Sequence, residues 1–238
     1  MNTIEEQILE CFPSGSYALS GLLRLMDIVE SDKVSTAAVE CRIQPRLLIN
    51  PDFVSRHAGT PEQLLMLVMH ELHHVLLGHT TLFPTVTAAD NFVFDSVINA
   101  LISRMFPQQD HLRFLTDYYS DRKFPECLLR PPPSWNGRTV ARFPKAIRDL
   151  PEQVRGRVAD VYRNLYSETG ASYEEIYEIL PRLLAEGELA AVPLLGGHEV
   201  DGSTNGDFEK SSPVLFEVVR SIVEEWPQPP DPIRGRSF

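Results

Sequence analysis

Residues 61–77 form an apolar stretch with several ionisable side chains in its middle. Six apolar residues at positions 64–69 come first, and three more follow at positions 75–77. A stretch that is apolar almost all the way round a helix predicts a helix buried in a core. The histidine and glutamate side chains at positions 70–74 would lie inside that core, where desolvating them costs several kcal/mol unless they have partners. The stretch therefore predicts a globular core with a polar centre.

These ionisable residues match the pattern HExxH, formed by His70, Glu71 and His74. Residues four apart in an α-helix lie about 40° apart around its axis and roughly 6 Å apart along it, so both imidazoles can reach one ion. Zinc at this place lowers the pKa of a bound water to about 7, and Glu71 can then take the proton. The pattern thus predicts peptide hydrolysis. HExxH also arises by chance in polar turns of surface helices, but the apolar flanks favour the zinc site.

The sequence also predicts where this helix begins and ends. Thr60, Pro61 and Gln63 match a capping box with proline at the first helical position. Gly78 is expected to end the helix. The HExxH pattern then lies in its C-terminal half.

Two further histidines near the motif are not expected to bind the ion. His73 lies about 60° back around the helix axis from His70, so it could flank the site, but we expect it to donate a hydrogen bond to the backbone or to face a neighbouring strand. His79 follows His74 by five residues, whereas the metzincin pattern needs a separation of six.

Catalytic zinc usually takes three protein ligands and a water, and the next apolar stretch supplies a candidate for the third ligand. Within residues 88–105, Asn91, Asp95 and Asn99 recur every four residues and form a polar stripe on a predicted helix. Such a stripe on a buried helix should face something polar. Asp95, which follows His74 by 21 residues, has the carboxylate that would complete the site.

Asn99 would lie one helical turn beyond Asp95. From there its amide could hydrogen-bond an imidazole and fix the tautomer and ring angle of that ligand. The alternative is that Asp95 and Asn99 form internal polar pairs, or that Asp90 caps the helix and nothing on it touches metal.

The pairing of HExxH with an acidic residue on a following helix resembles the gluzincin branch of the zincin metallopeptidases. In thermolysin-like gluzincins the third ligand is Glu with an Asp four residues later, whereas Asp95 and Asn99 have that spacing here. The strings HELHHVLLGH and FVFDSVINALI are also similar to bacterial metallopeptidase domains often found beside a von Willebrand A domain. This resemblance covers roughly residues 35–106. It implies a zincin-like α+β fold, mostly helical, with a small sheet over the HExxH helix.

Residues 37–43 and 46–54 contain short runs of aliphatic and β-branched side chains, interrupted by Pro45 and Pro51. They predict a small hairpin or two short strands. In a zincin such strands lie over the cleft, where an edge strand can pair with an extended peptide and present its carbonyl to zinc. An ordinary covering sheet is the alternative.

Length and composition indicate the domain organisation, the location and the partners to expect. The chain has 238 residues, 43% of them hydrophobic, and can bury a full core as one domain or as two packed lobes. We expect a zincin core at residues 1–106, a mainly helical C-terminal lobe at 107–226 and a proline-rich tail at 227–238. A charged-then-apolar leader and an apolar run of about 18 residues are both absent, so a cytoplasmic protein without a membrane partner is expected. The net charge of -11 disfavours nucleic acid as a partner.

The C-terminal part is predicted to be helical at residues 151–167, 172–184 and 214–226. Between the last two, His198 lies in the glycine-containing segment 196–199. Zincin chemistry benefits from a donor that stabilises the developing oxyanion, and His198 is the candidate for this catalytic role.

Three functions remain open from the sequence. The first is a zinc metallopeptidase for a peptide or protein substrate, with the ligands and base named above. The second is a regulatory module of the same fold that processes no peptide and works with a partner such as a von Willebrand A module, although an intact Glu71 disfavours it. The third is a carboxylate-bridged di-iron protein, which needs two Glu-x-x-His motifs, whereas the sequence has one, at 71–74.

Overall fold

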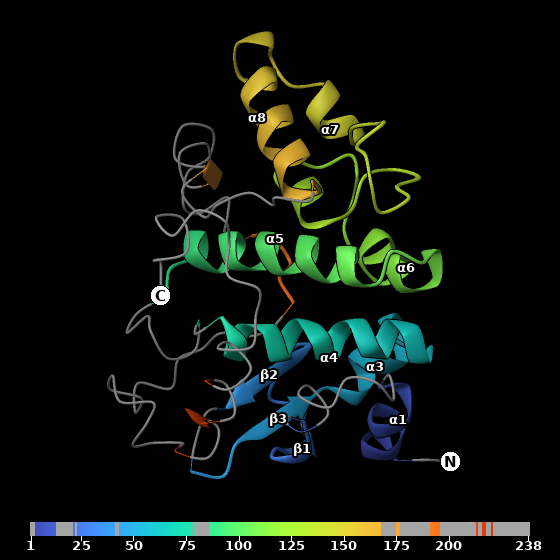
Figure 1. Ribbon diagram of the computed structural model, residues 1–238, viewed down its shortest axis with the longest axis vertical. Helices are drawn as coiled ribbons and strands as arrows, with labels where there is room; N and C mark the ends of the chain where they lie inside the picture. The colour runs from blue at the N-terminus through green and yellow to red at the C-terminus, as the bar shows by residue number, and fades with distance from the viewer. Residues whose placement is uncertain are drawn as a thin grey trace.

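The computed structural model describes residues 3–12, 21, 23–40, 43–77, 79, 86–167, 175–176, 191–195, 213, 216–217 and 220 (Figure 1). Gly78, His198 and the tail 227–238 lie outside the described residues. So do most residues of the helices expected at 172–184 and 214–226.

Within the described residues, the strands form one mixed three-stranded sheet. They are β1 (Asp27–Glu30), β2 (Ala37–Glu40) and β3 (Arg46–Ile49), in the order β1-β3-β2. β3 pairs parallel with β1 and antiparallel with β2, so that Leu47 lies opposite both Ile28 and Val39. The antiparallel pair of β2 and β3 matches the sequence prediction, whereas β1 was not expected.

β3 is shorter than the strand expected over residues 46–54, and that prediction is wrong from Asn50 onward. There the chain turns into α3 (Pro51–His57). The Asn50 side chain accepts hydrogen bonds from two backbone N–H groups in the first turn of α3. Asparagine is a favoured N-cap and proline fits the first helical position, so Pro51 starts a helix here instead of interrupting a strand.

α4 (Pro61–Leu76) is the buried helix predicted at the HExxH motif. It begins at the expected capping box: Thr60 Oγ1 accepts a hydrogen bond from the Gln63 N–H, and Gln63 Oε1 accepts one from the Thr60 N–H, each at 3.3 Å. Every residue from Leu64 to Leu76 is buried. The elements that α4 contacts include β2, α1 (Ile4–Cys11), α5 (Ala88–Met105) and α6 (Gln109–Tyr118).

α5 confirms the second predicted helix, with the expected bounds. It begins with a capping box in which Thr87 and Asp90 exchange hydrogen bonds. Asp90 therefore caps the helix, as one sequence interpretation allowed. Asp95 and Asn99 are nevertheless fully buried on the same helix.

The remaining described elements cover the far side of α5. η1 (Glu126–Leu129) and α8 (Glu152–Leu165) contact it, and α7 (Lys145–Arg148) contacts α8. α8 confirms the helix expected over residues 151–167. α6 was not expected from the sequence.

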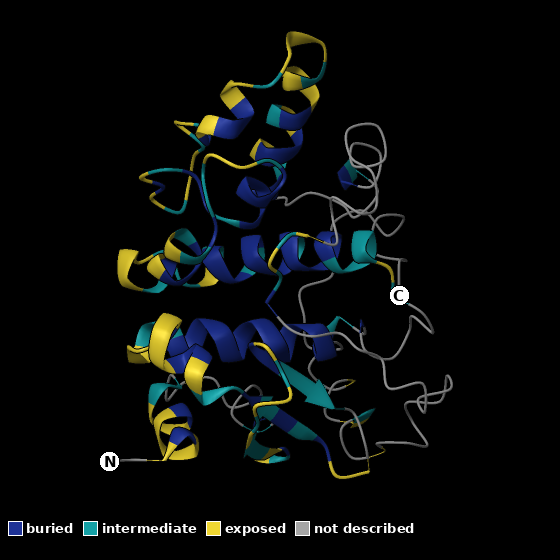
Figure 2. Cartoon of the chain, turned by 180° about the vertical axis from the view of Figure 1, so that it is seen from behind, coloured by how far each residue is buried: buried dark blue, intermediate teal, exposed yellow. Residues whose placement is uncertain are grey.

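The elements are stacked in layers, as Figure 1 shows. The sheet lies on one side of α4, α5 lies on the other, and α7 and α8 lie beyond α5. Figure 2 shows α4 and α5 buried over most of their lengths. The fold class is therefore α+β, and the contact between α4 and α5 lies in the middle of the molecule. Among the described helices, none combines the length and apolar character needed to cross a membrane.

Candidate metal centre

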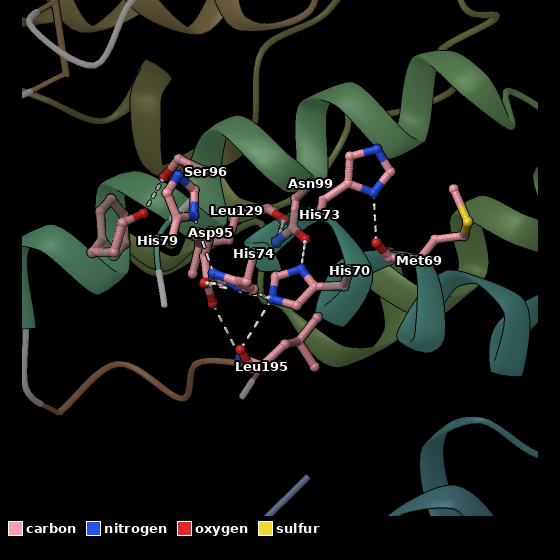
Figure 3. A network of polar contacts seen from close by, with 11 residues as sticks. Met69, His70, His73, His74, His79, Asp95, Ser96, Asn99, Leu129 and Leu195 are labelled. Atoms are coloured by element: carbon pink, nitrogen blue, oxygen red, sulfur yellow. Dashed lines mark hydrogen bonds and ion pairs between the residues drawn. The ribbon is translucent and has the colours of Figure 1, made fainter. Parts of the chain in front are cut away.

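Three polar side chains from α4 and α5 meet in the interior of the molecule (Figure 3). Two come from successive turns of α4, where the Nε2 atoms of His70 and His74 lie 3.1 Å apart. From α5, Asp95 Oδ1 lies 3.5 Å from His70 Nε2 and 3.3 Å from His74 Nε2. None of the three side chains is more than 1% exposed. We call these three residues the HHD cluster.

The spacing of the three donor atoms fits a metal ion. In a tetrahedral site with metal–ligand bonds of about 2.0–2.2 Å, neighbouring donors lie about 3.3–3.6 Å apart. Two of the separations here, 3.3 and 3.5 Å, lie in this range, and the third, 3.1 Å between the two imidazoles, is slightly shorter. Two imidazoles and one carboxylate are also a donor set that zinc and other first-row metals accept. The HHD cluster could therefore hold a metal ion.

Asn99 fixes the orientation of the first imidazole. Its Nδ2 donates to Leu129 O at 3.0 Å, which leaves Oδ1 to face His70 Nδ1 at 2.9 Å. Because an amide oxygen only accepts hydrogen bonds, His70 Nδ1 must carry a proton. Its Nε2 is then the nitrogen that can offer a lone pair to a metal.

The charge of Asp95 decides the protonation of His70 when no metal is bound. Burial by itself lowers the pKa of this imidazole, but the Asp95 carboxylate beside it raises the pKa to about 9, with smaller contributions from Glu71 and Asn99. At neutral pH the metal-free ring is therefore a cation, and its Nε2–H faces Leu195 O at 3.0 Å. A metal must displace this proton in order to bind.

His79 contacts the second imidazole on the side away from the HHD cluster. The Nδ1 atoms of His79 and His74 lie 3.1 Å apart. The backbone N–H of His79 donates to His74 O, and its ring stacks on Phe94 with the ring centroids 3.9 Å apart. His79 is not one of the three clustered donors, as expected. Its contact with His74 was missed because it depends on how the chain folds back after α4.

His73 points away from the HHD cluster (Figure 3). Its Nδ1–H donates to Met69 O at 2.6 Å, which is the backbone hydrogen bond expected from the sequence. Burial lowers the pKa of His73 to about 4, so the ring is neutral. This histidine is buried in α4 and is not part of the HHD cluster.

Glu71 lies in the same buried part of α4. Its side chain is 1% exposed, and its charge helps to raise the pKa of His70. A carboxylate buried beside the cluster is in the right region to exchange protons with a water there. His198, the sequence candidate for an oxyanion donor, lies outside the described residues.

Leu195 brings a distant part of the chain to the HHD cluster. Its backbone N–H donates to Asp95 Oδ2 at 3.2 Å, while its backbone oxygen lies 3.0 Å from His70 Nε2. These contacts join residues that are 100 and 125 positions apart. No local pattern in the sequence could have indicated them.

Tyr119, which follows α6, is a second residue near the site that the sequence did not indicate. Burial first, and then the charge of Asp95, holds the pKa of this phenol well above its ordinary value. Asn99 and the backbone of Leu195 are near enough to the hydroxyl to lower its pKa in turn. The phenol keeps its proton and can therefore donate a hydrogen bond. Tyr118 and Tyr119 look alike in the sequence, and only packing distinguishes them.

Comparisons of the chain with protein-family models, with curated proteins and with solved structures find no match. The function of the protein must therefore be inferred from the HHD cluster and from the groups that contact it.

Proposed function

We propose that this protein is a zinc-dependent metallopeptidase of the zincin type that hydrolyses peptide bonds in a peptide or protein substrate. The proposal rests on the HHD cluster, whose three buried donors have separations close to those of a tetrahedral metal site. Its two histidines come from α4, the helix that also contains Glu71. Bound zinc supplies a Lewis acid that activates water and polarises a peptide carbonyl.

In this proposal some residues of α4 and α5 bind the ion directly, and others position these ligands. His70, His74 and Asp95 are the ligands. Asn99 contacts Nδ1 of His70, and His79 contacts Nδ1 of His74. Both rings are therefore held in place before the ion binds. Such outer contacts keep the donor atoms from having to reorient on binding.

Glu71 is the general base. It accepts a proton from the attacking water and passes it to the leaving amine. Among the residues that the structure describes, Tyr119 is the candidate for the donor that stabilises negative charge on the carbonyl oxygen. It is a protonated phenol beside the HHD cluster.

The substitution Glu71→Gln tests this division of roles. Glutamine has nearly the same shape but cannot take the proton, so we expect wild-type zinc content and a loss of about a hundredfold or more in hydrolysis of fluorescein-labelled casein. Glu62→Gln, in the first turn of the same helix, is the matched control and should change neither quantity. If Glu71→Gln lost its zinc as well, Glu71 would be a ligand and the proposed mechanism would be wrong.

A second candidate is a metal-binding regulatory module of the same fold, which processes no peptide and works with a partner such as a von Willebrand A module. The observation that favours it is the backbone of Leu195, which already lies against His70 and Asp95. Zinc uptake without hydrolysis of casein or of a mixed peptide library, both in the wild type and in a variant that releases Leu195 from the site, would favour this candidate over the peptidase.

A further inference from the structure

Residues 191–195, with the sequence Ala-Val-Pro-Leu-Leu, pass between α4 and α5 at the HHD cluster (Figures 1 and 3). The main chain of Leu195 uses both of its polar groups there. Its N–H donates to the Asp95 oxygen that does not face the histidines, and its carbonyl oxygen lies beside the metal-facing nitrogen of His70. The peptide unit is thus placed against the same atoms that would hold the metal.

The side chains of this segment explain how it is held. Leu195 is fully buried, whereas Ala191 and Pro193 are exposed. Val192 and Leu194 are partly buried and pack against the core. Anchoring through apolar side chains, with main-chain hydrogen bonds to the protein, is how peptides are commonly bound in a groove.

Tyr119 lies near the same peptide unit, and its phenol is buried there. Its hydroxyl lies near the backbone of Leu195 and near Asn99. The main chain of Leu195 therefore contacts a carboxylate from α5 and an imidazole from α4, with a protonated phenol nearby. A substrate peptide at a metal centre needs the same surroundings, with its carbonyl at the donor atoms and its N–H on an acceptor.

We propose that residues 191–195 occupy the place of a peptide substrate, that the described conformation is a closed state of the site, and that the pocket filled by Leu195 takes an aliphatic side chain of the substrate. This inference rests on the proposed peptidase function. A segment of the same chain competes at an effective concentration on the order of millimolar, so a free peptide gains access only when the segment is displaced.

The test uses the full chain loaded with cobalt, whose visible absorption reports on ligands that reach the ion. The probe is acetohydroxamate. Leu195→Asp places a charge in the apolar pocket and should release the segment, whereas Ala191→Asp puts the same charge at an exposed position of the same segment. We expect Leu195→Asp to bind acetohydroxamate at least tenfold more tightly than the wild type or Ala191→Asp. Equal affinity in all three proteins would overturn the proposal.

A second measurement does not depend on metal or on activity. Because the Leu195 N–H donates to Asp95, its amide hydrogen should exchange slowly with solvent in the metal-free wild type and in Ala191→Asp. We expect exchange at least tenfold faster in Leu195→Asp. Rapid exchange across residues 191–195 in the wild type would overturn the closed state even if Leu195→Asp failed to fold. Failure of the wild type to take up cobalt would instead overturn the proposed function, and the two failures are therefore distinguishable.

Discussion

The side-chain amide of Asn99 determines which nitrogen of His70 can bind a metal. The Leu129 carbonyl fixes the amide, and the amide then fixes the imidazole. If the proposed zincin function holds, the thermolysin-like pattern would have aspartate at this spacing instead of asparagine. A neutral amide accepts the same hydrogen bond without burying a further negative charge beside Asp95, so it suits a cluster that already contains a fully buried carboxylate.

Removing this amide should weaken metal binding. Asn99→Ala leaves His70 Nδ1 without its acceptor, and we expect zinc affinity to fall by about 10- to 100-fold, measured by competition with a chromophoric chelator. Asn99→Asp keeps an acceptor and should lose less. Asn91→Ala, at the start of the same polar stripe, is the control, with unchanged affinity expected. Wild-type affinity in Asn99→Ala would show that the amide does not position the ligand.

At the scale of elements, the two helices that contribute the HHD cluster were the most predictable parts of the chain. Both α4 and α5 begin with a capping box and continue as long apolar stretches, and these signals depend only on neighbouring residues. α3 was misread because proline was taken to interrupt a strand, although after asparagine it starts a helix. The strands are only four residues long each, so their pattern is too short to predict β1.

The cap of α4 should contribute measurably to stability. Thr60→Ala removes the acceptor for the Gln63 N–H, and we expect the free energy of unfolding to fall by about 1 kcal/mol in urea titrations. Ser55→Ala removes an exposed hydroxyl that bonds only within α3, and should change stability by less than about 0.5 kcal/mol. Equal effects from the two substitutions would contradict a specific role for the cap.

At the scale of the whole molecule, the HHD cluster joins two layers, since its histidines come from α4 and its carboxylate from α5. The sequence could suggest the three donors because each lies on a periodic helix. It could not suggest Tyr119 or Leu195, which reach the site only through the packing of distant segments. It also could not suggest the contact between His79 and His74, although the two residues are only five positions apart. The grouping of these three side chains was thus predictable in outline, whereas the residues around them could be identified only from the structure.

Because the ion would bind both layers at once, metal binding should stabilise the fold. At a free zinc concentration one hundred times the dissociation constant, the free energy of unfolding should rise by about 2.7 kcal/mol. For a chain of this size, that corresponds to an increase of about 5–10 °C in Tm relative to protein in EDTA. Asp95→Ala should show little of this increase. The same increase in Asp95→Ala would mean that zinc stabilises the protein from another site.

Metal content per chain is the most direct test of the account. We would purify the wild type, His74→Ala and Asp95→Ala, confirm by circular dichroism that each is folded, and measure metals by elemental analysis. The HHD cluster predicts about one zinc per wild-type chain and little in either variant, because each variant loses a ligand. A folded wild type without metal, or variants with the same zinc content as the wild type, would contradict the metal centre.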